Sequence, residues 1–224
     1  MNYILSIETA TTNCSVSLSK EGKTIFLKED NSKNYSHAES LHVFIDAVLK
    51  ESGITSKALD AIAISKGPGS YTGLRIGVSA AKGLCFALDI PLIAVPTLEA
   101  LAHQVDCNDG VIVPMLDARR LEVYAAIFNS DYKEIRETEA QILDENAFAE
   151  YLDKSNVYFV GNGVEKTKAL INHPNAVFIE NKLPTAREMG MLAYNKYKIS
   201  DFEDVAYFEP YYLKDFVALK SSKS

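Results

Sequence analysis

The order of strands and helices predicted for the first half of this 224-residue chain returns in the second half. Alternating and periodic apolar residues predict three strands, a helix, a strand, a helix, a strand and a helix, and then the same eight elements again. The first predicted strands of the halves, Tyr3–Glu8 and Val111–Asp117, begin about 108 residues apart. Two copies of one mixed α/β unit predict two similar lobes with a ligand-binding cleft between them. One continuous α/β sheet is the alternative.

The predicted helices are 36–50, 73–88, 97–104, 145–152, 164–172 and 187–197. Two of them begin with a Ser/Thr-x-x-Glu capping box, formed by Ser36 with Glu39 and by Thr185 with Glu188. This order of elements resembles the actin-like, or ribonuclease H-like, lobe. It has three strands, of which two are joined by a hairpin, followed by crossover helices. We therefore expect an N-terminal lobe over 1–106, a C-terminal lobe over 107–200, and a C-terminal segment over 201–224 that ends in a frayed tail.

Composition and charge exclude several classes of protein. Hydrophobic residues make up 47% and charged residues 24% of the chain, as in ordinary globular proteins. The net charge of −7 gives no basic excess for binding a phosphate backbone, and no apolar run approaches the roughly 18 residues of a membrane helix. Cys14, Cys85 and Cys107 are far apart, which indicates buried thiols in a reducing compartment. We expect a cytoplasmic protein with no membrane segment.

The first hairpin of each lobe is the candidate nucleotide site, because these hairpins surround the phosphates in actin-like ATPases and sugar kinases. Such a loop needs an acidic residue, small residues and hydroxyl groups. The first hairpin here has an acid and hydroxyls but no glycine, and the second has arginines in place of small residues. We therefore predict a cleft or degenerate nucleotide site formed by Glu8, Thr9, Thr11, Thr12, Asp117, Arg119, Arg120 and Glu122. The arginines could bind an anion, Glu122, or carboxylates of a partner.

A glycine-rich segment leads from the predicted strand 61–65 into the helix 73–88. It matches neither the phosphate loop nor the dinucleotide fingerprint. Within the helix, Gly73, Gly77 and Ala81 stand four residues apart. Because each interior glycine costs about 1 kcal/mol relative to alanine, the helix is expected to use this small-residue seam for the close approach of another backbone. That backbone could belong to a partner helix or to the internal core.

The histidines give no convincing metal site. His37 and His42 are five residues apart, so they lie about 140° apart around a helix and cannot share a ligand face. The chain has no His-Glu-x-x-His motif and no Gly-x-Ser-x-Gly elbow. We expect neither a bound metal nor catalytic residues in this chain.

Three segments carry a resemblance to a known family. Residues 4–11 read ILSIETAT, residues 67–78 read GPGSYTGLRIGV, and residues 117–124 read DARRLEVY. Together they resemble the TsaB family of bacterial tRNA threonylcarbamoyladenosine (t6A) biosynthesis proteins. The family usually has aspartate where this chain has Glu8, and the longer side chain makes nucleotide binding there less favourable.

The resemblance implies an actin-like, non-catalytic subunit that pairs with the catalytic subunit TsaD and with the ATPase TsaE. Their complex transfers a threonylcarbamoyl group to N6 of adenosine 37 in tRNA. By this resemblance, ATP and metal are used by the partner subunits, no cofactor is bound tightly by this chain, and tRNA is contacted only through the complex. The free chain could form a homodimer when TsaD is absent.

Pairing in the TsaB family uses the first two helices, which correspond here to 36–50 and 73–88. The expected interface residues are Glu39, Leu41, Phe44, Ile45, Gly73, Leu74, Arg75, Gly77, Val78, Ala81 and Leu84. Arg75 is a candidate anchor for a carboxylate of the helix bundle that pairing would form. Two other functions stay open: a nucleotide hydrolase or small-molecule kinase acting alone, and a peptidase.

Overall fold

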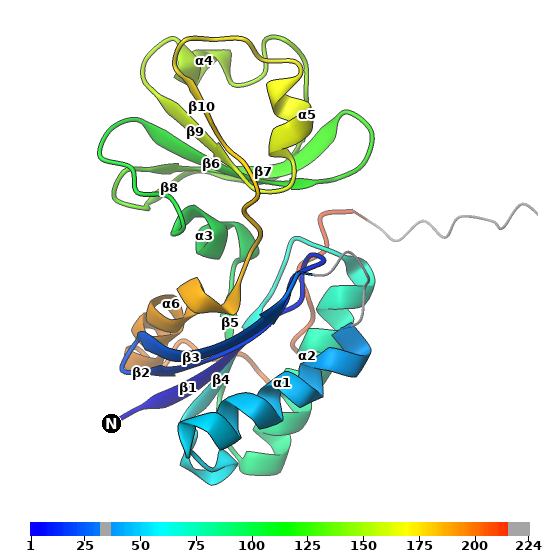
Figure 1. Cartoon of the computed structure of the whole chain (residues 1–224), viewed down its shortest axis with the longest axis vertical. Helices are drawn as coiled ribbons and strands as arrows, with labels where there is room; N and C mark the ends of the chain where they lie inside the picture. Colours follow the sequence, from blue (N-terminus) through cyan, green and yellow to red (C-terminus); the bar gives the residue numbers. More distant parts are fainter. Residues whose placement is uncertain (32–36, 215–224) are drawn as a thin grey trace, which may run out of the picture.

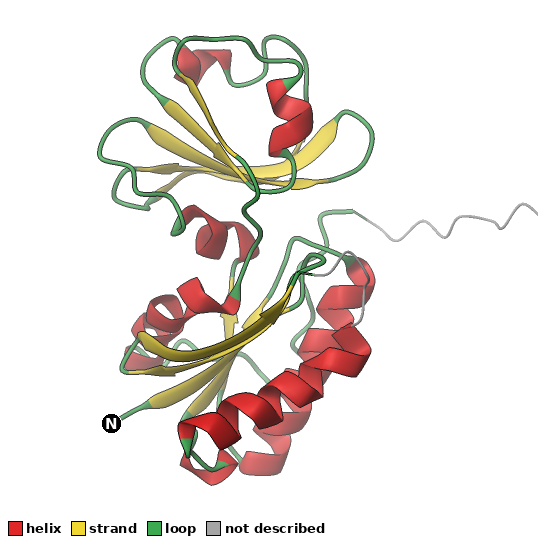
Figure 2. Cartoon of the chain, in the orientation of Figure 1, coloured by secondary structure: helices red, strands yellow, loops and turns green. Residues whose placement is uncertain are grey.

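A computed structural model describes residues 1–31 and 37–214, which form two lobes, each built on a five-stranded sheet (Figure 1, Figure 2). The first sheet has the order β3-β2-β1-β4-β5, with β1 (Tyr3–Glu8), β2 (Cys14–Lys20), β3 (Lys23–Asp30), β4 (Ala61–Ser65) and β5 (Leu92–Val95). The second has the order β10-β9-β6-β7-β8, with β6 (Val111–Asp117), β7 (Glu122–Asn129), β8 (Glu134–Ile142), β9 (Val157–Val160) and β10 (Ala176–Ile179).

The two sheets have the same topology. In each, the first strand pairs antiparallel with the second and parallel with the fourth. The predicted pair of similar lobes is therefore confirmed, and the single continuous sheet is wrong.

The helices are α1 (His37–Ser52), α2 (Tyr71–Leu88), α3 (Thr97–Ala102), α4 (Ala149–Leu152), α5 (Val164–Lys168) and α6 (Ala186–Lys198), with a 3₁₀ turn at Ser56–Ala58. Ser70 caps α2 by accepting a hydrogen bond from the Gly73 amide, so this helix begins earlier than predicted. Thr185 caps α6 as predicted, whereas the predicted cap Ser36 lies outside the described residues. The helix expected at 145–152 is shorter because Phe148, with φ 65°, has a left-handed backbone.

The two long helices α1 and α2 cover one face of the first sheet, and α6 covers the other face (Figure 1). Leu41, Ile45 and Val48 form the buried stripe of α1. They pack with apolar residues of β1, β2, β4 and α2 to form the core of the first lobe. Burial of these apolar side chains stabilises the packing of α1 on the first sheet through the hydrophobic effect.

The lobes exchange one helix each, which corrects the predicted boundaries at 106 and 200. The helix α3 follows the strands of the first sheet, but Leu98 and Leu101 pack against the second sheet. The helix α6 follows the strands of the second sheet, but Met189 and Ala193 pack against the first. Periodicity shows that a helix has an apolar face, but it does not show which sheet that face covers.

The C-terminal segment returns along the first lobe. The Glu203 amide donates to the Leu92 carbonyl at 2.9 Å, and Phe208 packs against the first core. The Tyr211 amide then donates to the Lys66 carbonyl at 2.7 Å. The tail predicted to be frayed lies outside the described residues. Among those that are described, no helix has the length and apolar character to cross a membrane.

Candidate functional site

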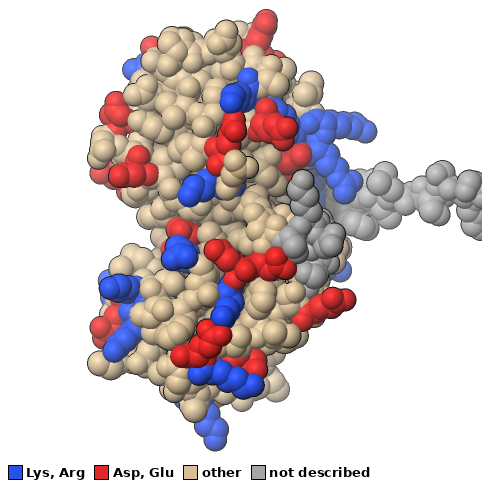
Figure 3. Space-filling view, in the orientation of Figure 1, with Lys and Arg blue, Asp and Glu red and all other residues tan. Residues whose placement is uncertain are grey.

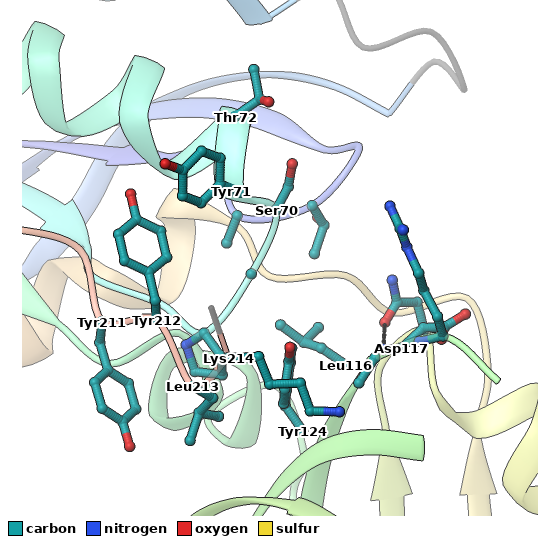
Figure 4. Close-up of a pocket in the computed structure, with 17 residues that line it drawn as sticks. Ser70, Tyr71, Thr72, Leu116, Asp117, Tyr124, Tyr211, Tyr212, Leu213 and Lys214 are labelled. Atoms are coloured by element: carbon teal, nitrogen blue, oxygen red, sulfur yellow. Dashed lines mark hydrogen bonds between the residues drawn. The ribbon is translucent and has the colours of Figure 1, made fainter. Parts of the chain in front are cut away.

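A cavity of about 400 Å³ lies between the lobes (Figure 4). Its walls come from both hairpins, the loop before α2, the β9–α5 loop and the C-terminal segment. The lining residues are Ala10, Thr11, Pro68, Gly69, Ser70, Tyr71, Thr72, Leu116, Asp117, Ala118, Arg119, Tyr124, Asn162, Tyr211, Tyr212, Leu213 and Lys214. This is the predicted interlobe cleft, and hydroxyl groups and aromatic rings form much of its wall.

The second hairpin is held by the chain itself. The Lys166 ammonium donates to the Asp117 carboxylate at 2.6 Å and to the carbonyls of Arg120 and Glu122 at 3.0 and 2.6 Å. The Asp117 carboxylate also accepts a hydrogen bond from the Arg119 amide at 2.6 Å. The acidic residue of this hairpin is therefore already neutralised by an internal cation. Among the described residues, Glu122 forms its ion pair with Lys214 and not with an arginine.

The acidic residue of the first hairpin is buried. Glu8 is fully excluded from solvent, and its Oε1 accepts a hydrogen bond from the Ala10 amide at 2.6 Å. Burial raises the pKa of Glu8 to about 7, although that hydrogen bond opposes the shift. Glu8 does not line the cavity.

The eight residues predicted for the cleft are therefore only partly brought together. Thr11, Asp117 and Arg119 line the cavity. Glu8, Thr9, Thr12, Arg120 and Glu122 do not, which corrects the prediction. Thr9 is buried against α2, where Gly73 and Gly77 lie next to it, whereas Glu8 is buried beside Ser65 of β4.

Part of the cavity wall was not predicted. Ser70 lies in the glycine-rich segment and Tyr124 lies in the segment 117–124 that carries the family resemblance, but Asn162 carried no signal. The aromatic residues of the C-terminal segment have different surroundings. Phe208 packs against the core of the first lobe, whereas Tyr212 lines the cavity and Tyr207 is 84% exposed.

The small-residue seam of α2 faces the interior. A Cβ at Gly73 would lie 2.2 Å from the Thr9 carbonyl, and one at Gly77 would lie 2.3 Å from the Thr9 hydroxyl. The seam thus lets the first hairpin approach α2, and the internal alternative is correct. Seven of the residues expected at a partner interface are buried inside the chain, namely Leu41, Ile45, Gly73, Leu74, Gly77, Val78 and Ala81.

The opposite side of α2 forms an open apolar groove with α1. The groove is lined by Ala38, His42, Tyr71, Thr72, Arg75, Ile76, Ser79, Ala80, Gly83 and Leu84. A Cβ at Gly83 would meet no atom within 4 Å, so its surroundings are open. Of the expected interface residues, Arg75 and Leu84 line the groove, Glu39 is exposed and Phe44 is half-buried. Phe86, on the same helix, is 86% exposed.

The two N-terminal histidines have different surroundings. His37 is buried, and its Nε2 donates to the Thr11 carbonyl at 2.7 Å, which ties α1 to the first hairpin. His42 lines the groove. Within residues 1–31 and 37–214, no three His, Cys, Asp or Glu side chains form a group that could hold a metal ion.

Comparison with known proteins identifies the family. The sequence is 31% identical to the tRNA threonylcarbamoyladenosine biosynthesis protein TsaB of Escherichia coli K12, over 97% of this chain and 96% of that protein. This chain belongs to the TsaB family. TsaB of Haemophilus influenzae is 30% identical over 97% of this chain and 95% of its own length. The resemblance drawn from the three sequence segments is confirmed, and membership supports a role in t6A biosynthesis.

The TsaB fold is confirmed by two solved structures from Pseudomonas aeruginosa. One, described as YeaZ, superposes with a TM-score of 0.81 at 28% identity, over 95% of this chain and all of that one. The other, described as an uncharacterized protein with similarity to peptidase YeaZ, has a TM-score of 0.84 at 26% identity, over 96% of this chain and all of that one. Residues 31–221 also match the family model described as TsaD, tRNA N6-adenosine threonylcarbamoyltransferase. This member of the TsaB family thus has the two-lobed, actin-like fold that was expected.

Proposed function

We propose that this TsaB-family chain is a non-catalytic subunit that binds and activates TsaD during t6A formation, and that it docks through the α1–α2 groove. The observation that carries the proposal is the groove itself. It is an open, apolar surface on the two helices that the family resemblance assigns to pairing. The buried seam on the other side of α2 supports the core, so the groove side is left for a partner.

The groove has the chemistry of a helix-packing surface. Ser79, Ala80 and Gly83 are small, so a partner helix could approach closely, while Ile76 and Leu84 offer apolar area. Exposed apolar surface of this kind usually indicates an interaction site. The same surface could pair with a second copy of the chain when TsaD is absent.

The cleft supports a non-catalytic role. Its two hairpin acids are engaged within the chain, Asp117 by Lys166 and Glu8 by burial. We therefore assign ATP and metal chemistry to TsaD and TsaE. Acidic and basic side chains are interleaved on the face in Figure 3, and with the net charge of −7 this favours tRNA contact through the complex.

The test is a bulky charged residue in the groove. Gly83→Arg places a long side chain where the partner helix would lie, without a clash inside this chain. We expect the affinity for TsaD, measured by calorimetry, to fall at least about tenfold while the melting temperature stays close to that of wild type.

The matched control is Asn195→Arg, an exposed position on α6, which covers the other face of the first sheet. It adds the same charge and should leave the affinity unchanged. Equal binding of Gly83→Arg and wild type would rule out the groove as the docking site. Turnover of ATP by the isolated chain would favour the alternative of an autonomous hydrolase or kinase.

A further inference from the structure

The C-terminal strap, residues 203–214, joins the groove to the cleft. Along α2 it is held by the Lys82 ammonium, which donates to the carbonyls of Ala206 and Phe208 at 3.0 and 3.1 Å. Together with the backbone bonds of Glu203 and Tyr211, these contacts fix the course of the strap on the first lobe. The end of the strap, at Lys214, then reaches the second lobe.

Three side chains connect the strap to the groove. The Tyr212 ring lies 5.0 Å from the Tyr71 ring, and the Tyr212 hydroxyl accepts a hydrogen bond from Arg75 Nε at 3.3 Å. The Arg75 guanidinium lies over the Tyr71 ring at 4.2 Å. Tyr71 lines both the groove and the cleft, so this cluster forms the wall between them.

The end of the strap crosses to the second lobe. Tyr212, Leu213 and Lys214 line the cleft, as Figure 4 shows. Lys214 forms an ion pair with Glu122 of β7. Because both side chains keep contact with solvent, this pair alone holds the strap weakly. The Tyr212 cluster, next to the backbone hydrogen bond of Tyr211, is therefore the main side-chain attachment of the end of the strap.

We propose that the strap couples docking in the groove to the cleft, because docking and the seating of the strap across the cleft favour each other. The seated strap holds Arg75 in place for a carboxylate of the partner, and the docked partner in turn holds the strap across the cleft. This inference rests on the proposed docking function of the groove. Arg75 is a long, exposed side chain, so holding it before docking lowers the entropy lost on binding.

Arg75 has donors left for such a carboxylate. In the described ranges 1–31 and 37–214, its hydrogen bond runs through Nε to Tyr212, and its two terminal nitrogens make none. Those nitrogens can form a bidentate contact with a carboxylate while Nε keeps Tyr212. Linkage then requires reciprocity, because a strap that favours docking must itself be stabilised by docking.

The first experiment measures TsaD affinity for Tyr212→Phe and for Tyr207→Phe. The first variant removes only the hydroxyl that holds Arg75, and the second removes the exposed hydroxyl of a tyrosine on the same strap. We expect a loss of roughly three- to tenfold for Tyr212→Phe and no change for Tyr207→Phe. In an Arg75→Ala background, Tyr212→Phe should cause no further loss.

The second experiment follows hydrogen exchange of peptides covering 203–214. Addition of TsaD should slow exchange in wild type and in Tyr207→Phe, and should slow it less in Tyr212→Phe. If wild type binds TsaD but Tyr212→Phe matches Tyr207→Phe in both measurements, the coupling is wrong while the docking function stands. A further loss from Tyr212→Phe in the Arg75→Ala background would also overturn it. If wild type fails to bind TsaD, the docking function itself fails.

Discussion

At the scale of single residues, Glu8 is the acid of the predicted nucleotide hairpin, and it is buried inside the first lobe. Its carboxylate accepts a hydrogen bond from the Ala10 amide, two residues further along the hairpin. A buried carboxylate is costly when ionised, so its protonated form is favoured. The sequence marks Glu8 as the acid of its hairpin but does not show that it is buried, because its burial beside Ser65 of β4 depends on packing between residues distant in the chain.

The titration of Glu8 gives a prediction for stability. The pKa of Glu8 is raised from 4.5 to about 7 in the folded state, so protonation of Glu8 stabilises the folded state. This contribution is fully present below about pH 4.5 and is lost as the pH rises through 7. Glu8→Gln keeps an acceptor for Ala10 and removes the titration. We expect the free energy of unfolding of the variant, relative to wild type, to rise by roughly 3 kcal/mol between pH 4.5 and pH 8.

Urea unfolding of both proteins at pH 4.5, 6 and 8 measures this difference. If the difference in unfolding free energy between the two proteins stayed constant from pH 4.5 to pH 8, the pKa of Glu8 would not be raised by its burial.

At the scale of elements, α2 has two faces made of small residues. The spacing of Gly73, Gly77 and Ala81 was visible in the sequence, and so was the need for a close backbone. Which face turns inward was not, because Ser79, Ala80 and Gly83 make the other face equally small. The contact of the seam with Thr9 decides it, and Thr9 is more than sixty residues away in the chain.

A matched pair of glycine substitutions tests this assignment. Gly77→Ala would place its Cβ against Thr9 and Ile64, so we expect the free energy of unfolding to fall by about 1–3 kcal/mol. The Cβ added by Gly83→Ala meets no atom, and alanine has a higher helix propensity than glycine. We therefore expect the free energy of unfolding to rise by up to about 1 kcal/mol. Denaturant unfolding of both variants gives the two signs, and equal signs would contradict the assignment of the faces.

At the scale of the whole molecule, the repeated order of elements was enough to predict two similar lobes. It did not predict the exchange of α3 and α6 between the lobes, because both helices have ordinary apolar faces. Nor did it predict that the C-terminal segment would line the cleft, since Tyr212 and Leu213 show no periodic pattern there. Those features depend on packing between parts that are distant in the sequence.

The proposed role of this chain in t6A formation is docking, with no chemistry of its own. Reconstituted t6A formation on tRNA with TsaD and TsaE tests this role when either wild-type chain or Gly83→Arg is added at increasing concentration. We predict that product requires this chain, that Gly83→Arg is inactive at concentrations where wild type is active, and that higher concentrations restore activity as binding is restored. Full activity of Gly83→Arg without binding, or product formed by this chain without TsaD, would contradict the claim.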